Sequence, residues 1–225
     1  SPDYEAGPIH AIRVRASDER GAAIEETFTV VVIDDPLDNS ITIPSSEVIA
    51  SDPAAHDNFG TSLSQSGDLL AVGAYLTDLD ENETDVGAAY LYRVEENGST
   101  TALSKVMAPD GAANDRFGES VSVSGDLLAV GVQYADLDDN KTNAGAAYLY
   151  RVEENGSVTY LAKVTAPDAA AEDQFGASVS LSDGVLAVGA HWRDKNGLTN
   201  SGAVYLYRLE PDDSVKTLGK LIAQP

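Results

Sequence analysis

The chain has 225 residues, of which 37 are acidic and 14 are basic, so its formal net charge is −23. A field of this sign repels nucleic acid and anionic lipid and favours cations or basic partners. The sequence has no cysteine, which excludes disulfide scaffolds and cysteine-ligated zinc. It also has no apolar run near the ~18 residues of a membrane span, so we expect no membrane insertion by this segment.

The first 39 residues predict two strands of a β-domain. Residues 9–16 alternate apolar and polar side chains, and residues 26–33 do so more weakly. Residues 17–21 between them are typical of a turn, and residues 34–39 form a polar boundary that contains a proline. Two strands are too few for an independent fold. We therefore expect residues 1–39 to be the end of a larger β-domain.

From residue 45 onward the sequence repeats. Three Phe-Gly pairs, which begin at Phe59, Phe117 and Phe175, lie 58 residues apart. Each pair is followed by a serine-rich alternating stretch, a tight Ser/Gly/Asp turn, an apolar run that ends in glycine, an acidic loop and the motif Gly-Ala-x-Tyr-Leu-Tyr. A repeat of this kind is typical of an architecture of stacked equal units. The three units are expected at about residues 45–102, 103–160 and 161–225.

The second copy predicts four short antiparallel strands, and this pattern fixes the fold class. The strands are expected at residues 118–124, 127–132, 145–152 and 158–164. Four short strands with glycine-rich turns and no helical period describe one blade of a β-propeller. The predicted fold is therefore all-β, a partial propeller of three four-stranded antiparallel blades. Because a closed ring usually has ~4–8 blades, we expect a segment of a longer protein in which further blades or other chains complete the ring.

These motifs resemble the FG-GAP repeat family, which builds the β-propeller of integrin alpha chains and of many bacterial surface proteins. The resemblance covers all three copies, in Phe-Gly-x-Ser-(Leu/Val)-Ser, Leu-Ala-Val-Gly-(Ala/Val) and Gly-Ala-x-Tyr-Leu-Tyr. We expect the glycines to let neighbouring strands approach closely. We expect the phenylalanine to form a wedge between blades rather than a ligand contact.

Residues 1–39 resemble the C-terminal third of a cadherin-type domain, which is the end of a β-sandwich. The matching pieces are Asp3-Tyr4-Glu5, Ala16-Ser17-Asp18 and the Asp/Asn-rich exit at 34–39. Carried over by position, the resemblance implies calcium ligands at Glu5, Asp18, Asp34 and Asp38. The proline and leucine of the exit depart from the family's Asp-x-Asn-Asp run. The alternative is that these acidic loops are merely solvated.

The calcium loop of integrin-type repeats has no counterpart of sufficient length here. That loop lies between the first and second strands, where this chain has only a short turn, which cannot wrap a cation that needs ~6–8 oxygens. Acidic residues lie instead between the second and third strands. The candidate calcium ligands there, spaced as Asp-x-Asp-x-Asn in the first two copies, are Asp78, Asp80, Asn82, Asp136, Asp138, Asn140, Asp194 and Asn196. An ordinary polar turn cluster is the alternative, because the central glycine and terminal glutamate of an EF-hand are missing.

In an up-and-down blade these acidic loops and the links between blades emerge on one face, which we expect to bind the ligand. The corresponding face of integrins does so, by analogy. At His191-Trp192-Arg193 the third copy departs from the other two. A tryptophan beside an arginine either stacks on a sugar or peptide or fills an irregular gap between blades.

The sequence shows no catalytic constellation. The three histidines do not repeat, and no Gly-x-Ser-x-Gly, phosphate-loop or zinc pattern is present. We therefore expect an extracellular, non-catalytic adhesion or binding module of a large secreted or cell-surface protein from a bacterium, with a protein or glycan ligand and calcium as its ion. One alternative is a structural spacer repeat without its own ligand. The other is a propeller-based carbohydrate-active enzyme.

Overall fold

The computed structural model of the protein describes residues 9–17, 23–31, 47–194 and 197–222. The chain separates into two units, Ser1–Ser45 and Ser46–Pro225. Every helix or strand assigned within the described ranges is a β-strand, which confirms the predicted all-β class.

The first unit contains a two-stranded antiparallel sheet. Strand β1 (Ile9–Ser17) pairs with β2 (Ala23–Val31), with Ile9 opposite Val31 and Ser17 opposite Ala23. Both strands predicted from the alternating pattern are therefore confirmed, each within three residues of its expected bounds. The cadherin-like sandwich stays a prediction, because the motifs that imply it lie almost entirely outside the described residues.

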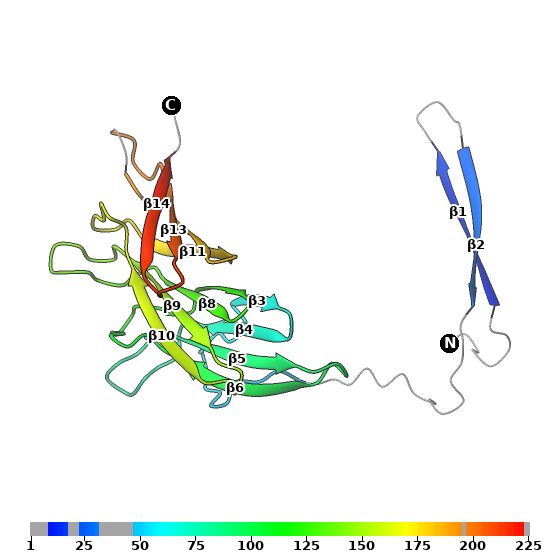
Figure 1. The fold of residues 1–225 in the computed structure, drawn as a ribbon, viewed down its shortest axis with the longest axis horizontal. Helices are drawn as coiled ribbons and strands as arrows, with labels where there is room; N and C mark the ends of the chain where they lie inside the picture. The colour runs from blue at the N-terminus through cyan, green and yellow to red at the C-terminus, as the bar shows by residue number, and fades with distance from the viewer. Residues whose placement is uncertain (1–8, 18–22, 32–46, 195–196, 223–225) are drawn as a thin grey trace. The chain divides into compact units, whose positions relative to one another are not determined.

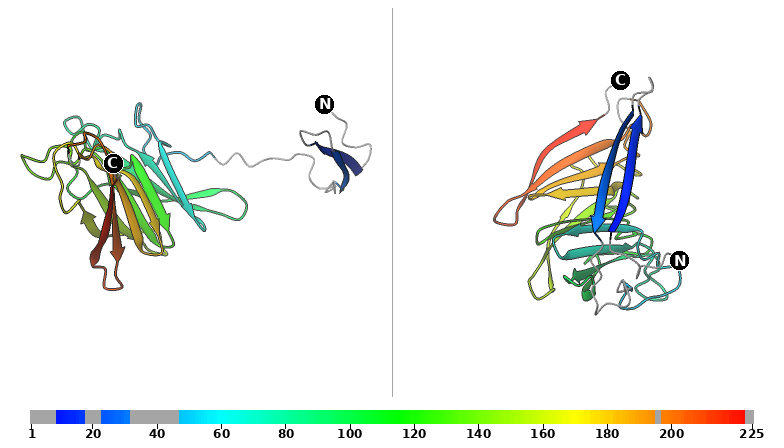
Figure 2. Two further views of the ribbon diagram at one scale, coloured as in Figure 1. Left: turned by 90° about the horizontal axis from the view of Figure 1, so that it is seen from above. Right: turned by 90° about the vertical axis from the view of Figure 1, so that its right-hand side faces the viewer.

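The second unit contains three four-stranded antiparallel sheets, each with its strands in chain order (Figures 1 and 2). The first sheet holds β3 (Ser62–Ser66), β4 (Leu69–Ala74), β5 (Ala88–Val94) and β6 (Thr100–Val106). The second holds β7 (Ser120–Ser124), β8 (Leu127–Val132), β9 (Ala146–Val152) and β10 (Val158–Val164). The third holds β11 (Phe175–Ser182), β12 (Val185–Ala190), β13 (Ala203–Leu209) and β14 (Val215–Ile222). These are the predicted blades of a partial propeller, and the three blades do not close a ring.

The Phe-Gly pair of each later repeat lies between its own blade and the preceding one. The backbone N–H of Phe117 donates to the Val86 carbonyl of the first blade at 2.8 Å. Its ring is fully buried and meets Tyr148 and Tyr150 of the second blade edge-on, with centroids 5.7 and 6.1 Å away. Phe175 repeats this arrangement between the second and third blades. The predicted wedge role of the phenylalanine is confirmed.

Alternating serines on the first strand of a blade bind the backbone of the next blade. Ser62 Oγ donates to the Gly118 carbonyl at 2.8 Å, and Ser64 Oγ accepts from a backbone N–H of β7 at 2.9 Å. Ser120 and Ser122 make the same two bonds to the third blade. The serine-rich stretch is therefore the polar half of the contact between blades, and the Phe-Gly pair is the apolar half.

Candidate functional site

The loops between the second and third strands of the blades lie beside the links between blades and form what we call the rim. The rim consists of loops 75–87, 133–145 and 191–202, without residues 195–196, and links 50–61, 107–119 and 165–174. Backbone bonds join the two sets, since Arg116 N donates to Asp85 O and Gln174 N donates to Asn143 O, both at 3.1 Å. The arrangement expected from the up-and-down topology is confirmed.

The first aspartate of each rim loop caps the far end of that loop. Asp78 and Asp136 each accept, through Oδ1, from the backbone N–H seven residues later at 2.8 Å. Asp194, in the shorter third loop, accepts from the N–H six residues later at the same distance. These carboxylates satisfy loop donors that no strand partner reaches, which is a structural use of the aspartate.

The second aspartate of the first two loops closes a smaller turn. Asp80 Oδ1 accepts from the backbone N–H of Asn82 at 2.7 Å, and Asp138 Oδ1 accepts from that of Asn140 at 2.9 Å. This is the geometry of an Asx turn. Within the described ranges no group of three or more His, Cys, Asp or Glu side chains lies together in a way that could hold a metal ion. In this arrangement the carboxylates serve as loop caps and do not converge on one point.

The other candidate ligands lie outside the described residues. They are Glu5, Asp18, Asp34, Asp38 and Asn196. Calcium binding at all of the candidate positions stays a prediction.

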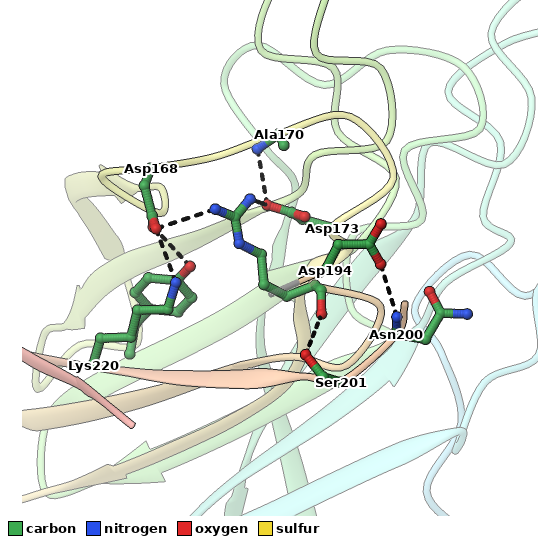
Figure 3. A network of polar contacts seen from close by, with 9 residues as sticks. Asp168, Ala170, Asp173, Asp194, Asn200, Ser201 and Lys220 are labelled. Atoms are coloured by element: carbon green, nitrogen blue, oxygen red, sulfur yellow. Dashed lines mark hydrogen bonds and ion pairs between the residues drawn. The ribbon is translucent and has the colours of Figure 1, made fainter. Parts of the chain in front are cut away.

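The first aspartate in each link is bound by a tyrosine and a lysine of the blade that follows the link. In the third blade, Asp168 accepts from the hydroxyl of Tyr205 and from Lys220 Nζ, both at 2.8 Å. Arg193 adds a third donor at 3.1 Å and also binds Asp173 (Figure 3). The same Tyr–Asp–Lys group recurs at Asp52 and Asp110 in the other two blades. Cations of the chain itself thus neutralise part of the acidic rim.

The ionisation of Asp168 makes the stability of the folded rim depend on pH. Partial burial alone would raise the pKa of this carboxyl, but the bonds from Lys220 and Tyr205 and the charge of Arg193 lower it to about 2. A depressed pKa in the folded state contributes stability above the unfolded value, and that contribution is lost as the pH falls through the folded pKa.

We therefore expect Asp168→Asn to lower the melting temperature at pH 5, and we expect its difference from the wild type to shrink between about pH 4 and pH 2. Thermal melts across this range check the result. Asp183→Asn, at an exposed carboxylate in the β11–β12 turn, is the control and should show little difference at either end. A difference for Asp168→Asn that stays constant with pH would contradict this role of the charge.

A group of side chains that does not repeat lies on the rim between the first and second blades. The guanidinium of Arg116 lies over the ring of Tyr134 at 4.7 Å from the centroid and over that of Tyr75 at 5.6 Å. Its Nε is buried and has no hydrogen-bond partner. Beside it, Gln133 Nε2 donates to a carboxylate oxygen of Glu119. We call these five residues the Arg116 cluster.

The neighbours of Glu119 affect the pKa of its carboxyl. Burial raises the pKa of its carboxyl, while the charge of Arg116, the bond from Gln133 and the charge of His191 act against that rise. His191 is the third-repeat counterpart of Gln133, and the adjacent Trp192 is 46% exposed.

Sequence reasoning found only part of this group. The departure of the third copy at His191-Trp192-Arg193 marks the repeat position that Gln133 and Tyr75 occupy in the other copies, but nothing in the sequence connected that position with Arg116 or Glu119. The counterparts of Arg116 are Asn58 and Gln174, and those of Glu119 are Thr61 and Ala177. Positions at which one repeat differs from the other two were the available signal for this group in the sequence.

Comparison with known families agrees with the blades. A family profile described as "FG-GAP repeat" matches residues 45–92, 100–150 and 158–207. Each segment contains the first two strands of one blade and most of the third, and the second and third segments begin with the last strand of the blade before. The chain belongs to the FG-GAP repeat family. The wedge phenylalanines, the close glycines and the serine contacts are thus features of three FG-GAP repeats in this chain.

Other comparisons add little to the FG-GAP assignment. A comparison with curated proteins found no match. Among 65 matching chains of solved structures is Sqt1 from Chaetomium thermophilum, with 16% identity and a TM-score of 0.46. The alignment covers 76% of this chain and 38% of the Sqt1 chain. In the part of the chain that the structure describes, no helix has the length and apolar character needed to cross a membrane.

Proposed function

We propose that these FG-GAP repeats form a non-catalytic binding module of an extracellular or cell-surface protein of bacterial origin, with a protein or a glycan as ligand. Repeats of this family are typical of extracellular proteins. The observation that supports the proposal is the Arg116 cluster. The three repeats share their packing residues, but they differ from one another at the positions of this cluster.

The Arg116 cluster has the composition of a recognition surface. A guanidinium carries five N–H donors, and those of Arg116 make no hydrogen bond to another described side chain. Glu119 and Gln133 add acceptors and donors, and the two tyrosines add flat apolar faces. Sites that bind small groups combine a few placed polar atoms with aromatic surface in this way. A protein surface with a strongly negative total charge gains selectivity from an arginine in such a position.

Binding to glycan arrays and to immobilised extracellular matrix proteins tests this proposal. For a ligand found in this way, we expect Arg116→Ala to weaken binding by about tenfold or more, because a guanidinium held between aromatic rings is typical of a binding hot spot. Arg208→Ala is the matched control, since Arg208 is exposed at the opposite end of its blade. Equal affinities for both variants would contradict the assignment of the site. Absence of any ligand would favour the structural spacer.

Calcium dependence is a separate proposal that rests on the Asp-x-Asp-x-Asn spacing. It requires that calcium raises the melting temperature of the wild type, because an ion that binds only the folded state stabilises it. The double variant Asp80→Asn/Asp138→Asn keeps an oxygen for each Asx turn and removes both charges, so it should lose that rise. Magnesium is the control ion. Identical melting curves with and without calcium would contradict calcium binding. The aspartates of these loops would then serve only to cap the backbone of the loops.

A further inference from the structure

Arg116 is a cation without a carboxylate partner in an acidic part of the molecule. Within the described ranges its guanidinium forms no ion pair and no hydrogen bond, although its charge acts on Glu119. Arg193 of the third rim loop differs, since it pairs with Asp168 at 3.1 Å and also with Asp173. The chain therefore neutralises the second arginine twice and leaves the positive charge of the first available to an external anion.

The contacts that hold Arg116 in place use none of its hydrogen-bond donors. Its guanidinium lies against the rings of Tyr134 and Tyr75, which attract a cation through their faces. Its Nε is buried, whereas Nη1 and Nη2 are not buried and have no partner among the described residues. The end of the guanidinium that carries two nitrogens thus reaches the surface in a position that is set before a ligand arrives, which lowers the entropic cost of binding.

A single carboxylate is the anion that best fits this position. A guanidinium binds a carboxylate through two parallel N–H···O bonds, because the two planar groups match in geometry. The loops that begin with Tyr75 and Gln133 carry the exposed Glu81 and Asp139, which have no cationic partner among the described residues. A ligand with many negative charges would be repelled by these side chains. A ligand with one isolated carboxylate avoids most of that repulsion.

The polar neighbours of Arg116 offer acceptors for hydroxyl groups. Gln133 Nε2 donates to Glu119 Oε2. The Oε1 atoms of both side chains make no hydrogen bond to a described residue and are not buried. Sugar hydroxyls donate to oxygens of this kind, and the tyrosine rings add the flat apolar surface that small-ligand sites combine with a few polar atoms. A cation, two open acceptors and aromatic rings therefore match a sugar that carries a carboxylate.

We propose that the Arg116 cluster binds a uronic acid residue of an otherwise neutral glycan. The carboxylate of the uronic acid pairs with Nη1 and Nη2 of Arg116, and hydroxyls of the same sugar donate to Oε1 of Gln133 and of Glu119. The inference rests on the proposed function, because it names the ligand class of the same binding site.

A protein ligand is the second source of such an anion. An aspartate or glutamate side chain carries the same carboxylate, but it brings no group of neighbouring hydroxyls to the two open oxygens beside Arg116. The sugar uses more of the polar atoms that the cluster leaves without a partner, so the glycan is favoured.

Binding of matched oligosaccharides to the whole 225-residue chain tests the proposal. Each probe ends in a single glucuronic or galacturonic acid, and each control is the same sugar with its carboxyl reduced to an alcohol. We expect calorimetry to show saturable binding of an acidic probe and at least about tenfold weaker binding of its reduced form. Arg116→Ala should abolish this preference. Arg116→Lys, which keeps the charge but not the planar pair of donors, should retain only part of it.

Arg208→Ala is the control variant and should leave the preference unchanged, and melting curves establish that all three variants fold. Equal binding of acidic and reduced probes, or a preference that survives in Arg116→Ala, would overturn the inference. A glycine-serine peptide with one aspartate that binds where no acidic sugar does would assign the cluster to a protein ligand. These results leave the proposed binding function intact, whereas absence of any ligand on the glycan and matrix-protein arrays would contradict that function as well.

Discussion

Phe117→Ala is expected to destabilise the second unit by about 3–5 kcal/mol, the usual cost of removing a buried aromatic ring. The ring is 0% exposed and meets two buried tyrosines edge-on. Its removal leaves a cavity between two blades that hydrogen bonds hold in place, so the site has little freedom to collapse. Urea unfolding of the wild type and the variant measures the difference.

Phe59→Ala is the matched control for this prediction. Phe59 meets the corresponding tyrosines of the first blade, at 5.5 and 6.2 Å, but it is only half-buried, and within the described residues no other blade packs on it. The expected loss is clearly smaller than that for Phe117→Ala. Equal losses for the two variants would mean that the contact with the preceding blade contributes nothing.

Gly145→Ala is the second substitution with a large expected effect, about 2–5 kcal/mol in total. Its φ is +83°, which costs an alanine about 1–2 kcal/mol. The added Cβ would in addition lie 2.0 Å from the carbonyl oxygen and 2.6 Å from the nitrogen of Phe175. Both are backbone atoms that cannot move without separating the second and third blades, and such overpacking adds about 1–3 kcal/mol.

Gly202→Ala separates the two contributions. Gly202 is the counterpart of Gly145 in the third blade, and its φ is +76°. The nearest atom to an added Cβ is 3.6 Å away, which is ordinary contact. Only the conformational cost of about 1–2 kcal/mol is expected there. Urea unfolding of both variants checks the contrast, and similar losses would show that the close approach of the blades is not what requires glycine.

The strands could be predicted closely because the same pattern of residues occurs three times along the chain. The apolar run 127–132 and the alternating stretch before it are strands β8 and β7, with β8 at the predicted bounds. The role of the phenylalanine also followed, since a large apolar residue next to glycine at a fixed period fits a contact between units. Periodicity served well wherever the repeats agree.

The loops and the candidate site could not be predicted from the repeat pattern in the same way. Asp80 and Asn82 fit both a cation loop and an Asx turn, because both use short oxygen-bearing side chains two residues apart, and the observed bond from Asn82 to Asp80 is that of the turn. The Arg116 cluster depends on a contact between Arg116 of one repeat and Tyr75 of the previous one. No spacing within a single repeat contains that information.

The serine contacts carry a consequence for the history of such chains. Each β3 or β7 serine binds a main-chain atom of its neighbour, and main-chain atoms are the same whatever residue bears them. These polar contacts therefore do not depend on which side chain the neighbouring unit carries at the bonded positions. Gain or loss of one whole 58-residue unit by recombination would preserve the serine contacts at the new junction, whereas it would separate a group such as the Arg116 cluster, which combines side chains of two adjacent repeats.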